Sequence, residues 1–192
     1  MNLKYNSLKT DPEQFYKISI DPFKVRNKKS EWKKAEIILS YINSTNSTKL
    51  LDIGCGEGIF TNYYYNNITC EKMYGCDISS VAINRAKKLN DKIEFMVYDI
   101  TGHPPEKYLR YKFDFILISE LLYYLPKDKL QHAIENIFTF GKKNSKLLIC
   151  NSQGFSTSEL SSLFENLYFI DGIHSYKVLK GYDTLLMKYT RK

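Results

Sequence analysis

From Lys49 onward, short apolar runs alternate with amphipathic stretches, and this alternation constrains the fold more than any other feature of the chain. The apolar runs have the length of strands and lie at residues 50–53, 72–76, 93–97, 113–118 and 146–150. The stretches that follow them show helical spacing, and the last one opens with a capping box formed by Ser156 and Glu159. Strands that alternate with helices predict βαβ units and a parallel sheet that is covered on both faces.

The two ends of the chain add to this pattern. Segments 168–177 and 182–189 look extended and have no helix between them, which predicts a hairpin with an antiparallel strand. Apolar residues at helical spacing from Trp32 to Ile42 predict an N-terminal helix that Ser30 caps. We therefore predict an α/β fold with a mainly parallel, seven-stranded sheet. Residues 1–48 are expected to form a helical cap and substrate lid, and residues 49–192 the core of one compact domain.

Composition argues against several classes of protein. The chain has 192 residues, enough for one domain with a full hydrophobic core. No apolar run approaches the ~18 residues that span a bilayer, and no signal peptide is evident, so we expect a cytoplasmic protein with no membrane partner. Four cysteines and three histidines lack metal-ligand spacing, which predicts reduced thiols and no metal. The net charge of +7 is concentrated at the two ends of the chain, without the basic stripe that is typical of nucleic-acid binders.

A glycine-rich segment, residues 52–58, joins the first predicted strand to a helix that begins near Ile59. Glycines here allow the backbone to turn sharply and to approach a ligand at the helix N-terminus. Ile59 occupies the position of the third glycine of a dinucleotide-binding fingerprint, and a Walker motif is absent, so the loop suits a nucleoside-like ligand. Asp77 and Asp99 follow the next two strands, where a carboxylate can bind ribose hydroxyls and an adenine amino group, respectively.

Together these residues resemble the class I S-adenosylmethionine-dependent methyltransferases, over a region that runs from about Lys49 to the end of the chain. The apolar run 113–118 belongs to the same pattern. The segments 119–126 and 21–34 further resemble the nodulation protein S (NodS)-like group, small enzymes that methylate amino sugars and related compounds. The resemblance implies a Rossmann-like domain that binds S-adenosylmethionine.

The resemblance also implies roles at the methionine end of the cofactor. Gly54, Cys55 and Gly56 would supply backbone contacts, and Asp52 would orient the loop and reach the amino group through water. Ser119, after the fourth strand, would also bind the cofactor.

At the adenosine end, Asp77 would bind the ribose and Ile78 would pack on the adenine. Asp99 would accept the adenine amino group, and the Ile100 backbone would contact a ring nitrogen. Helix capping or turn formation remains an alternative for Asp77 and for Asp99. Trp32, with Tyr16 and Phe23, could cover the cofactor as part of a lid, or Trp32 could simply pack on its helix.

The segment after the fourth strand faces the methyl group in this fold, which makes Glu120, Tyr123 and Tyr124 the polar candidates for catalysis. Glu120 could instead cap the next helix or pair with a lysine, and the two tyrosines could be core aromatics with hydrated hydroxyl groups. His174 could act as a base above the pocket, or it could be structural. An amine acceptor needs only to arrive deprotonated, whereas a hydroxyl acceptor usually needs a general base.

Absent motifs narrow the methyl acceptor. The segment after the fourth strand lacks the Asn/Asp-Pro-Pro-Tyr motif, which would have resembled the methyltransferases that act on bases or on glutamine amides. The chain also has no Pro-Cys pair to serve as a nucleophile toward pyrimidine C5, and no aspartate cluster for a catalytic metal. We therefore expect transfer to nitrogen or oxygen of a small polar metabolite, a sugar or amino-sugar derivative, by a monomer or homodimer. A non-catalytic cofactor sensor, an RNA-binding accessory module and an RNA or protein methyltransferase remain alternatives.

Overall fold

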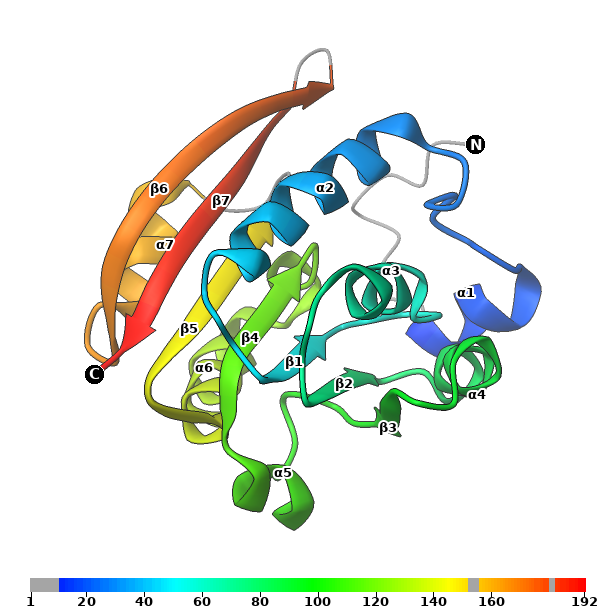
Figure 1. The fold of residues 1–192 in the computed structure, drawn as a ribbon, viewed down its shortest axis with the longest axis horizontal. Helices are drawn as coiled ribbons and strands as arrows, with labels where there is room; N and C mark the ends of the chain where they lie inside the picture. The colour runs from blue at the N-terminus through cyan, green and yellow to red at the C-terminus, as the bar shows by residue number, and fades with distance from the viewer. Residues whose placement is uncertain (1–10, 152–155, 180–181) are drawn as a thin grey trace.

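A computed structural model describes residues 11–151, 156–179 and 182–192 as a seven-stranded sheet with helices on both faces (Figure 1). The strands are β1 (Lys49–Ile53), β2 (Lys72–Asp77), β3 (Glu94–Val97), β4 (Phe113–Ser119), β5 (Gly141–Asn151), β6 (Tyr168–Leu179) and β7 (Tyr182–Arg191). Their order in the sheet is β3-β2-β1-β4-β5-β7-β6. Strands β1 to β5 pair in parallel, and β7 is antiparallel to both β5 and β6. The predicted fold class is confirmed.

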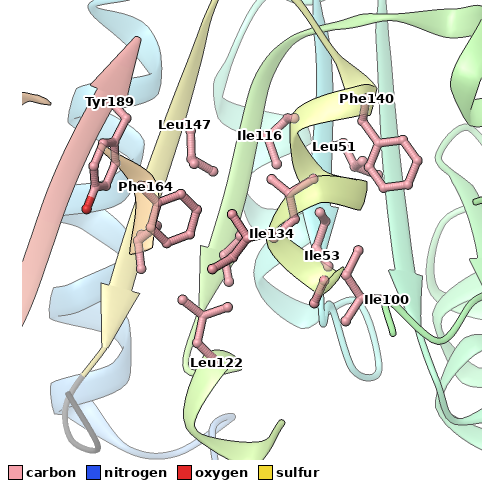
Figure 2. Packing of buried hydrophobic residues seen from close by; sticks show 14 of the residues in the cluster. Leu51, Ile53, Ile100, Ile116, Leu122, Ile134, Phe140, Leu147, Phe164 and Tyr189 are labelled. Carbon is pink, nitrogen blue, oxygen red and sulfur yellow. The ribbon is translucent and has the colours of Figure 1, made fainter. Parts of the chain in front are cut away.

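The helices lie on the two faces of this sheet. They are α1 (Pro12–Ile18), α2 (Lys29–Asn43), α3 (Ile59–Asn67), α4 (Ser80–Leu89), α5 (Glu106–Tyr111), α6 (Lys127–Phe140) and α7 (Thr157–Phe164), with a 3-10 turn, η2, at Leu122–Tyr124. Helices α2, α3 and α4 cover one face, and α5, α6 and α7 cover the other. Successive strand residues therefore enter different cores: Leu50 packs under α2 and Leu51 packs under α6. Figure 2 shows the second core, in which Ile134 and Phe140 of α6 face the strands.

The chain order reverses between β1 and β4, and this reversal positions the site. Strands β2 and β3 are added on one side of β1, whereas β4 and β5 are added on its other side. The segments that leave the carboxyl ends of β1 and β4 therefore lead to helices on opposite faces of the sheet, α3 and α6. Ligands of open α/β sheets bind at such a switch point.

The structure differs from the predicted elements in three places. Helix α2 begins at Lys29 with Lys28 as its N-cap residue, so Ser30 lies inside the helix and does not cap it. Strand β5 begins at Gly141, before the predicted run 146–150. The prediction missed its start because residues 142–144 are exposed and polar, and the pairing with β4 is irregular there. The helices α1 and α5 were not predicted, because each has too few residues for apolar side chains to recur at helical spacing. The capping box at the start of α7 is present as predicted.

Among the described residues, no helix combines the length and the apolar character that crossing a bilayer requires.

We expect Ile134→Ala to lower the free energy of unfolding by about 2–5 kcal/mol, because Ile134 is fully buried between α6 and the sheet and its removal leaves a cavity. The matched substitution Ile18→Ala removes the same atoms from a residue that is 82% exposed, and should change stability by less than about 0.5 kcal/mol. Urea unfolding followed by circular dichroism measures both. Equal losses would contradict the described packing of α6.

Candidate active site

The glycine loop after β1 is shaped by left-handed backbone conformations. Gly54, Gly56 and Gly58 have φ angles of 79°, 54° and 72°. The N–H groups of Gly54 and Cys55 both donate to the carbonyl of Cys76, at 2.8 and 3.0 Å, which ties the loop to the end of β2. A Cβ atom added at Gly56 would lie 2.7 Å from the hydroxyl oxygen of Tyr16, whose side chain is buried. Glycine is therefore favoured at Gly56 by its φ angle, and a larger residue would also displace the Tyr16 hydroxyl.

Asp77, at the end of β2, links the glycine loop to helix α4. Its Oδ2 accepts from the N–H of Gly56 and its Oδ1 accepts from the N–H of Ser79, each at 2.9 Å. Burial raises the pKa of Asp77, and these two backbone donors oppose that rise. The sequence allowed two roles for Asp77, ribose binding and turn formation, and the hydrogen bond to Ser79 is the turn-forming contact. Ser79 itself caps α4 by accepting from Ala82 N–H.

Asp99 and Ile78 lie at the neighbouring strand ends. Asp99 Oδ1 accepts from both the backbone N–H and the hydroxyl of Thr101, each at 2.8 Å, so this carboxylate also forms a turn. Ile78 is exposed beside Asp77, as an apolar surface for a ligand ring would be. Ile100 is buried, and its carbonyl accepts from Asn136 Nδ2 at 2.8 Å.

Asp52 lies beneath the glycine loop in a buried position. Its Oδ2 accepts from the Thr61 hydroxyl at 2.6 Å, a contact that fastens the first turn of α3 to β1. Burial raises the pKa of Asp52 from an ordinary value of 3.8 to about 6. The carboxyl group therefore titrates near neutral pH while it supports the loop.

A buried group of charged residues lies at the end of β4. Lys34 Nζ of α2 donates to Glu120 Oε1 at 2.9 Å and pairs with Glu31 Oε2 at 2.6 Å. The hydroxyl of Tyr123 donates to Glu120 Oε2 at 2.8 Å. Burial opposes the charge of Lys34, yet the carboxylates of Glu120 and Glu31 raise its pKa above the ordinary value. The lysine pairing that was an alternative for Glu120 is thus present.

This charged cluster is adjacent to the glycine loop. A Cβ atom added at Gly54 would lie 3.1 Å from the side chain of Leu121, the residue after Glu120. The Tyr123 and Tyr124 rings contact each other at a centroid separation of 4.5 Å. Tyr124 is partly exposed, at 38%, whereas Glu120 lies deeper. The structure therefore brings three of the four predicted catalytic residues to the edge of the cofactor loop.

Glu13 of α1 binds the first turn of α4. Its carboxylate accepts from the hydroxyls of Ser79 and Ser80, at 2.6 and 2.7 Å. These hydrogen bonds lower the pKa of Glu13 to about 2. A negative charge is favourable at a helix N-terminus, so α1 is held beside Asp77.

Arg85 and Glu57 hold the segment that follows α1. Arg85 donates to the carbonyls of Tyr16 and Ser19, at 2.7 and 3.0 Å, and pairs with Glu57 Oε1 at 2.6 Å. The buried Glu57 carboxylate also pairs with Arg26 at 3.2 Å. Because Glu57 belongs to the glycine loop, this network holds the N-terminal segment over the loop.

Two predicted residues lie elsewhere. Trp32 packs edge-on against Phe60 and Tyr63 of α3, and its Nε1–H donates to the Arg26 carbonyl at 2.8 Å. These contacts fit the packing role that the sequence left open beside cofactor binding. His174 lies in β6, the edge strand, which is separated from β4 by β5 and β7. The sheet therefore does not bring the backbone of His174 next to Glu120.

Four residues of the site have no local signal in the sequence: Glu13, Lys34, Glu57 and Arg85. Apart from the pair of Lys34 with Glu31, the side-chain contacts described above join these residues to positions 28 to 86 residues away in the chain. Glu57 lies inside the glycine motif and Lys34 inside the segment 21–34, whereas Glu13 and Arg85 lie in none of the motifs that carry the resemblance.

The strand order, the glycine loop and the acidic residues at successive strand ends define a class I methyltransferase domain. A methyltransferase domain family model matches residues 44–174, and the chain belongs to this family. The chain is 26% identical over 119 residues to the 235L protein of Invertebrate iridescent virus 6, which is named as a methyltransferase. That match covers 62% of this chain and 43% of the viral protein, so the chain spans less than half the length of that relative.

Solved structures share the fold at low sequence identity. The N-methyltransferase NodS from Bradyrhizobium japonicum, in complex with S-adenosylhomocysteine, has a TM-score of 0.77 at 19% identity, over 97% of each chain. Magnesium protoporphyrin IX methyltransferase from Synechocystis, with bound S-adenosylmethionine, has a TM-score of 0.71 at 13% identity, over 98% of this chain and 89% of that one. A methyltransferase from Haloferax volcanii, in complex with the activator Trm112, has a TM-score of 0.77 at 14% identity, over 95% and 99%.

The cofactor is S-adenosylmethionine, as family membership implies. The residues present fit it: a loop with left-handed glycines at the start of a helix, a partly buried carboxylate at Asp77, and the exposed apolar side chain of Ile78 beside it. Among the described residues, no group of three or more His, Cys, Asp and Glu side chains is arranged to hold a metal.

Asp77→Ala should weaken binding of S-adenosylhomocysteine by about 1–3 kcal/mol, because the resemblance assigns to this carboxylate hydrogen bonds from the ribose hydroxyls that the variant cannot accept. Isothermal titration calorimetry measures the change. Asp91→Ala, which removes an exposed carboxylate after α4, is the matched control and should leave the affinity unchanged. Unaltered affinity in Asp77→Ala would contradict the assignment.

The raised pKa of Asp52 predicts a pH-dependent stability. A carboxyl group whose pKa is higher in the folded state favours folding less as pH rises from about 4 to about 6, since ionisation is easier in the unfolded chain. Asp52→Asn removes this effect, so between pH 4 and pH 7 its stability should gain about 2 kcal/mol relative to wild type. Urea unfolding at both pH values measures the difference, with Asp91→Asn as the control. A difference that does not vary with pH would contradict the buried, ionisable Asp52.

Proposed function

We propose that the protein transfers a methyl group from S-adenosylmethionine to nitrogen or oxygen of a small polar metabolite, a sugar or amino-sugar derivative. The observation that carries this proposal is the Glu120 cluster, a partly buried carboxylate with two tyrosines beside the glycine loop. We further propose that the protein acts in the cytoplasm as a monomer or homodimer and without a metal.

The residues of the cluster suit a polar acceptor. Glu120 accepts hydrogen bonds from Lys34 and Tyr123, and a carboxylate has further lone pairs with which to accept from an acceptor N–H or O–H. The partly exposed Tyr124 ring offers an aromatic face on which a sugar ring can stack, and its hydroxyl offers a polar group.

The catalytic demand on this chain is modest. The bound cofactor supplies a methyl group on a positively charged sulfonium, and that charge disappears as the methyl group is transferred. The protein must align the attacking atom and exclude water. The N-terminal segment that Glu57 and Arg85 hold over the glycine loop supports the second requirement.

The comparisons support the acceptor class only by analogy. NodS is described as an N-methyltransferase, and its structure aligns with nearly the whole of this chain, which favours a nitrogen acceptor. The Haloferax volcanii methyltransferase is described in a complex with an activator protein. The acceptor screen must therefore also address the alternative that this chain acts together with an accessory subunit.

A screen with radiolabelled S-adenosylmethionine tests the proposal, with amino sugars, nucleotide sugars, small amines and bulk RNA as acceptors. We expect transfer to a small amine- or hydroxyl-bearing compound that persists in chelator, and a marked loss of transfer in Glu120→Gln.

Transfer to RNA alone would remove the small-molecule proposal, and loss of activity in chelator would remove the metal-free one. Salt-sensitive RNA binding without transfer to any acceptor would favour an RNA-binding module. Full activity in Glu120→Gln would leave Glu120 with a structural role.

A further inference from the structure

Lys34 is a buried cation that, among the described residues, forms ion pairs with Glu31 and with Glu120 of the candidate acceptor site. The residue is 4% exposed, although it lies on a helix with exposed lysines on either side of the buried face. Its ammonium contacts Glu120 Oε1 at 2.9 Å and Glu31 Oε2 at 2.6 Å. It therefore joins α2, which precedes the sheet in the chain, to the carboxyl end of β4, 86 positions later.

Glu120 is held in a conformation that it would not adopt unaided. Its φ angle is 56°, in the left-handed region that glycine favours. Its N–H donates to the Cys150 carbonyl at 2.8 Å, which fixes the backbone, while Lys34 and Tyr123 each bind one carboxylate oxygen. Strain at a non-glycine residue persists where surrounding contacts over-determine it, and such residues concentrate at functional sites.

A purely structural role does not account for this ion pair. Helix α2 is already fixed to the sheet by Ala35, Ile38 and Ile42, which are almost fully buried. The desolvation penalty of a buried ion pair largely cancels its attraction, and apolar residues of similar size often serve stability equally well. What an apolar side chain cannot do is fix the direction of the Glu120 carboxylate.

We propose that Lys34 is a positioning residue for methyl transfer, which holds the Glu120 carboxylate in the one orientation that meets the acceptor. The inference rests on the proposed function, in which Glu120 contacts the acceptor. Glu31 balances the charge of Lys34, so the three residues Glu31, Lys34 and Glu120 keep one net negative charge at the site. Helix α2 thereby becomes part of the acceptor site and not only its cover.

Kinetics of five variants test this role. Lys34→Met should lower kcat on the order of 100-fold, the loss expected when a reacting group is misplaced, and should leave the affinity for S-adenosylhomocysteine within about twofold. Lys34→Arg, which keeps the charge, should recover part of kcat. The exposed neighbour gives the matched control, Lys33→Met, which should behave as wild type.

The fourth and fifth variants are Glu120→Gln and the double variant with Lys34→Met. If Lys34 acts through Glu120, the double variant loses no more activity than Glu120→Gln alone. Losses that multiply in the double variant would overturn the proposal, as would a normal kcat in Lys34→Met. If Lys34→Met does not fold, Lys34→Gln, which keeps a polar side chain, replaces it in both comparisons.

A crystal structure of Lys34→Met with S-adenosylhomocysteine tests the inference without an acceptor. We expect the Glu120 carboxylate to leave its position next to Tyr123, and an unmoved carboxylate would overturn the positioning role. If the acceptor screen finds no substrate, the proposed function fails on that result, whereas this structural comparison still decides whether Lys34 positions Glu120.

Discussion

The structure depends on one constraint: a parallel sheet whose strands β1, β4 and β5 are buried on both faces. Such strands must be apolar on each side, as Leu50 and Leu51 are in β1. Polar side chains are then confined to the strand ends, where the sheet stops. Asp77 and Glu120 lie at two such ends, and the strand order reverses between β1 and β4, the position at which open α/β sheets bind ligands. The requirement that buries the core thus also gathers the chemistry at one edge.

The site has two parts with different physical characters. The proposed cofactor part is made mainly of backbone: left-handed glycines, N–H groups bound to the Cys76 carbonyl, and the Asp77 carboxylate, which accepts from two backbone N–H groups. The proposed acceptor part is made of paired side chains, Lys34 with Glu120 among them. Backbone geometry is set by local sequence, whereas a buried ion pair exists only when two distant elements meet.

The N-terminal segment shows how the two parts are joined. It has little apolar contact of its own to hold it, and Ile18 and Ile20 on it are strongly exposed. It is held by charge instead: Glu13 at the first turn of α4, and Arg85 with Glu57 at the glycine loop. These polar contacts, together with the buried Tyr16 side chain, tie the segment to the glycine loop and to α4.

The sequence by itself determined the order of elements, the glycine loop and the acidic strand ends, because periodicity and turn chemistry act over a few residues. It also indicated Glu120, Tyr123 and Tyr124 through their place after β4. It misplaced the cap of α2 and the start of β5, where exposed polar residues carry no periodic signal. Only the tertiary structure decided that Lys34 reaches Glu120, that Tyr16 lies against Gly56, and that His174 lies on the edge strand. These contacts join residues far apart in the chain, and packing of helices on the sheet, which no local pattern encodes, brings them together.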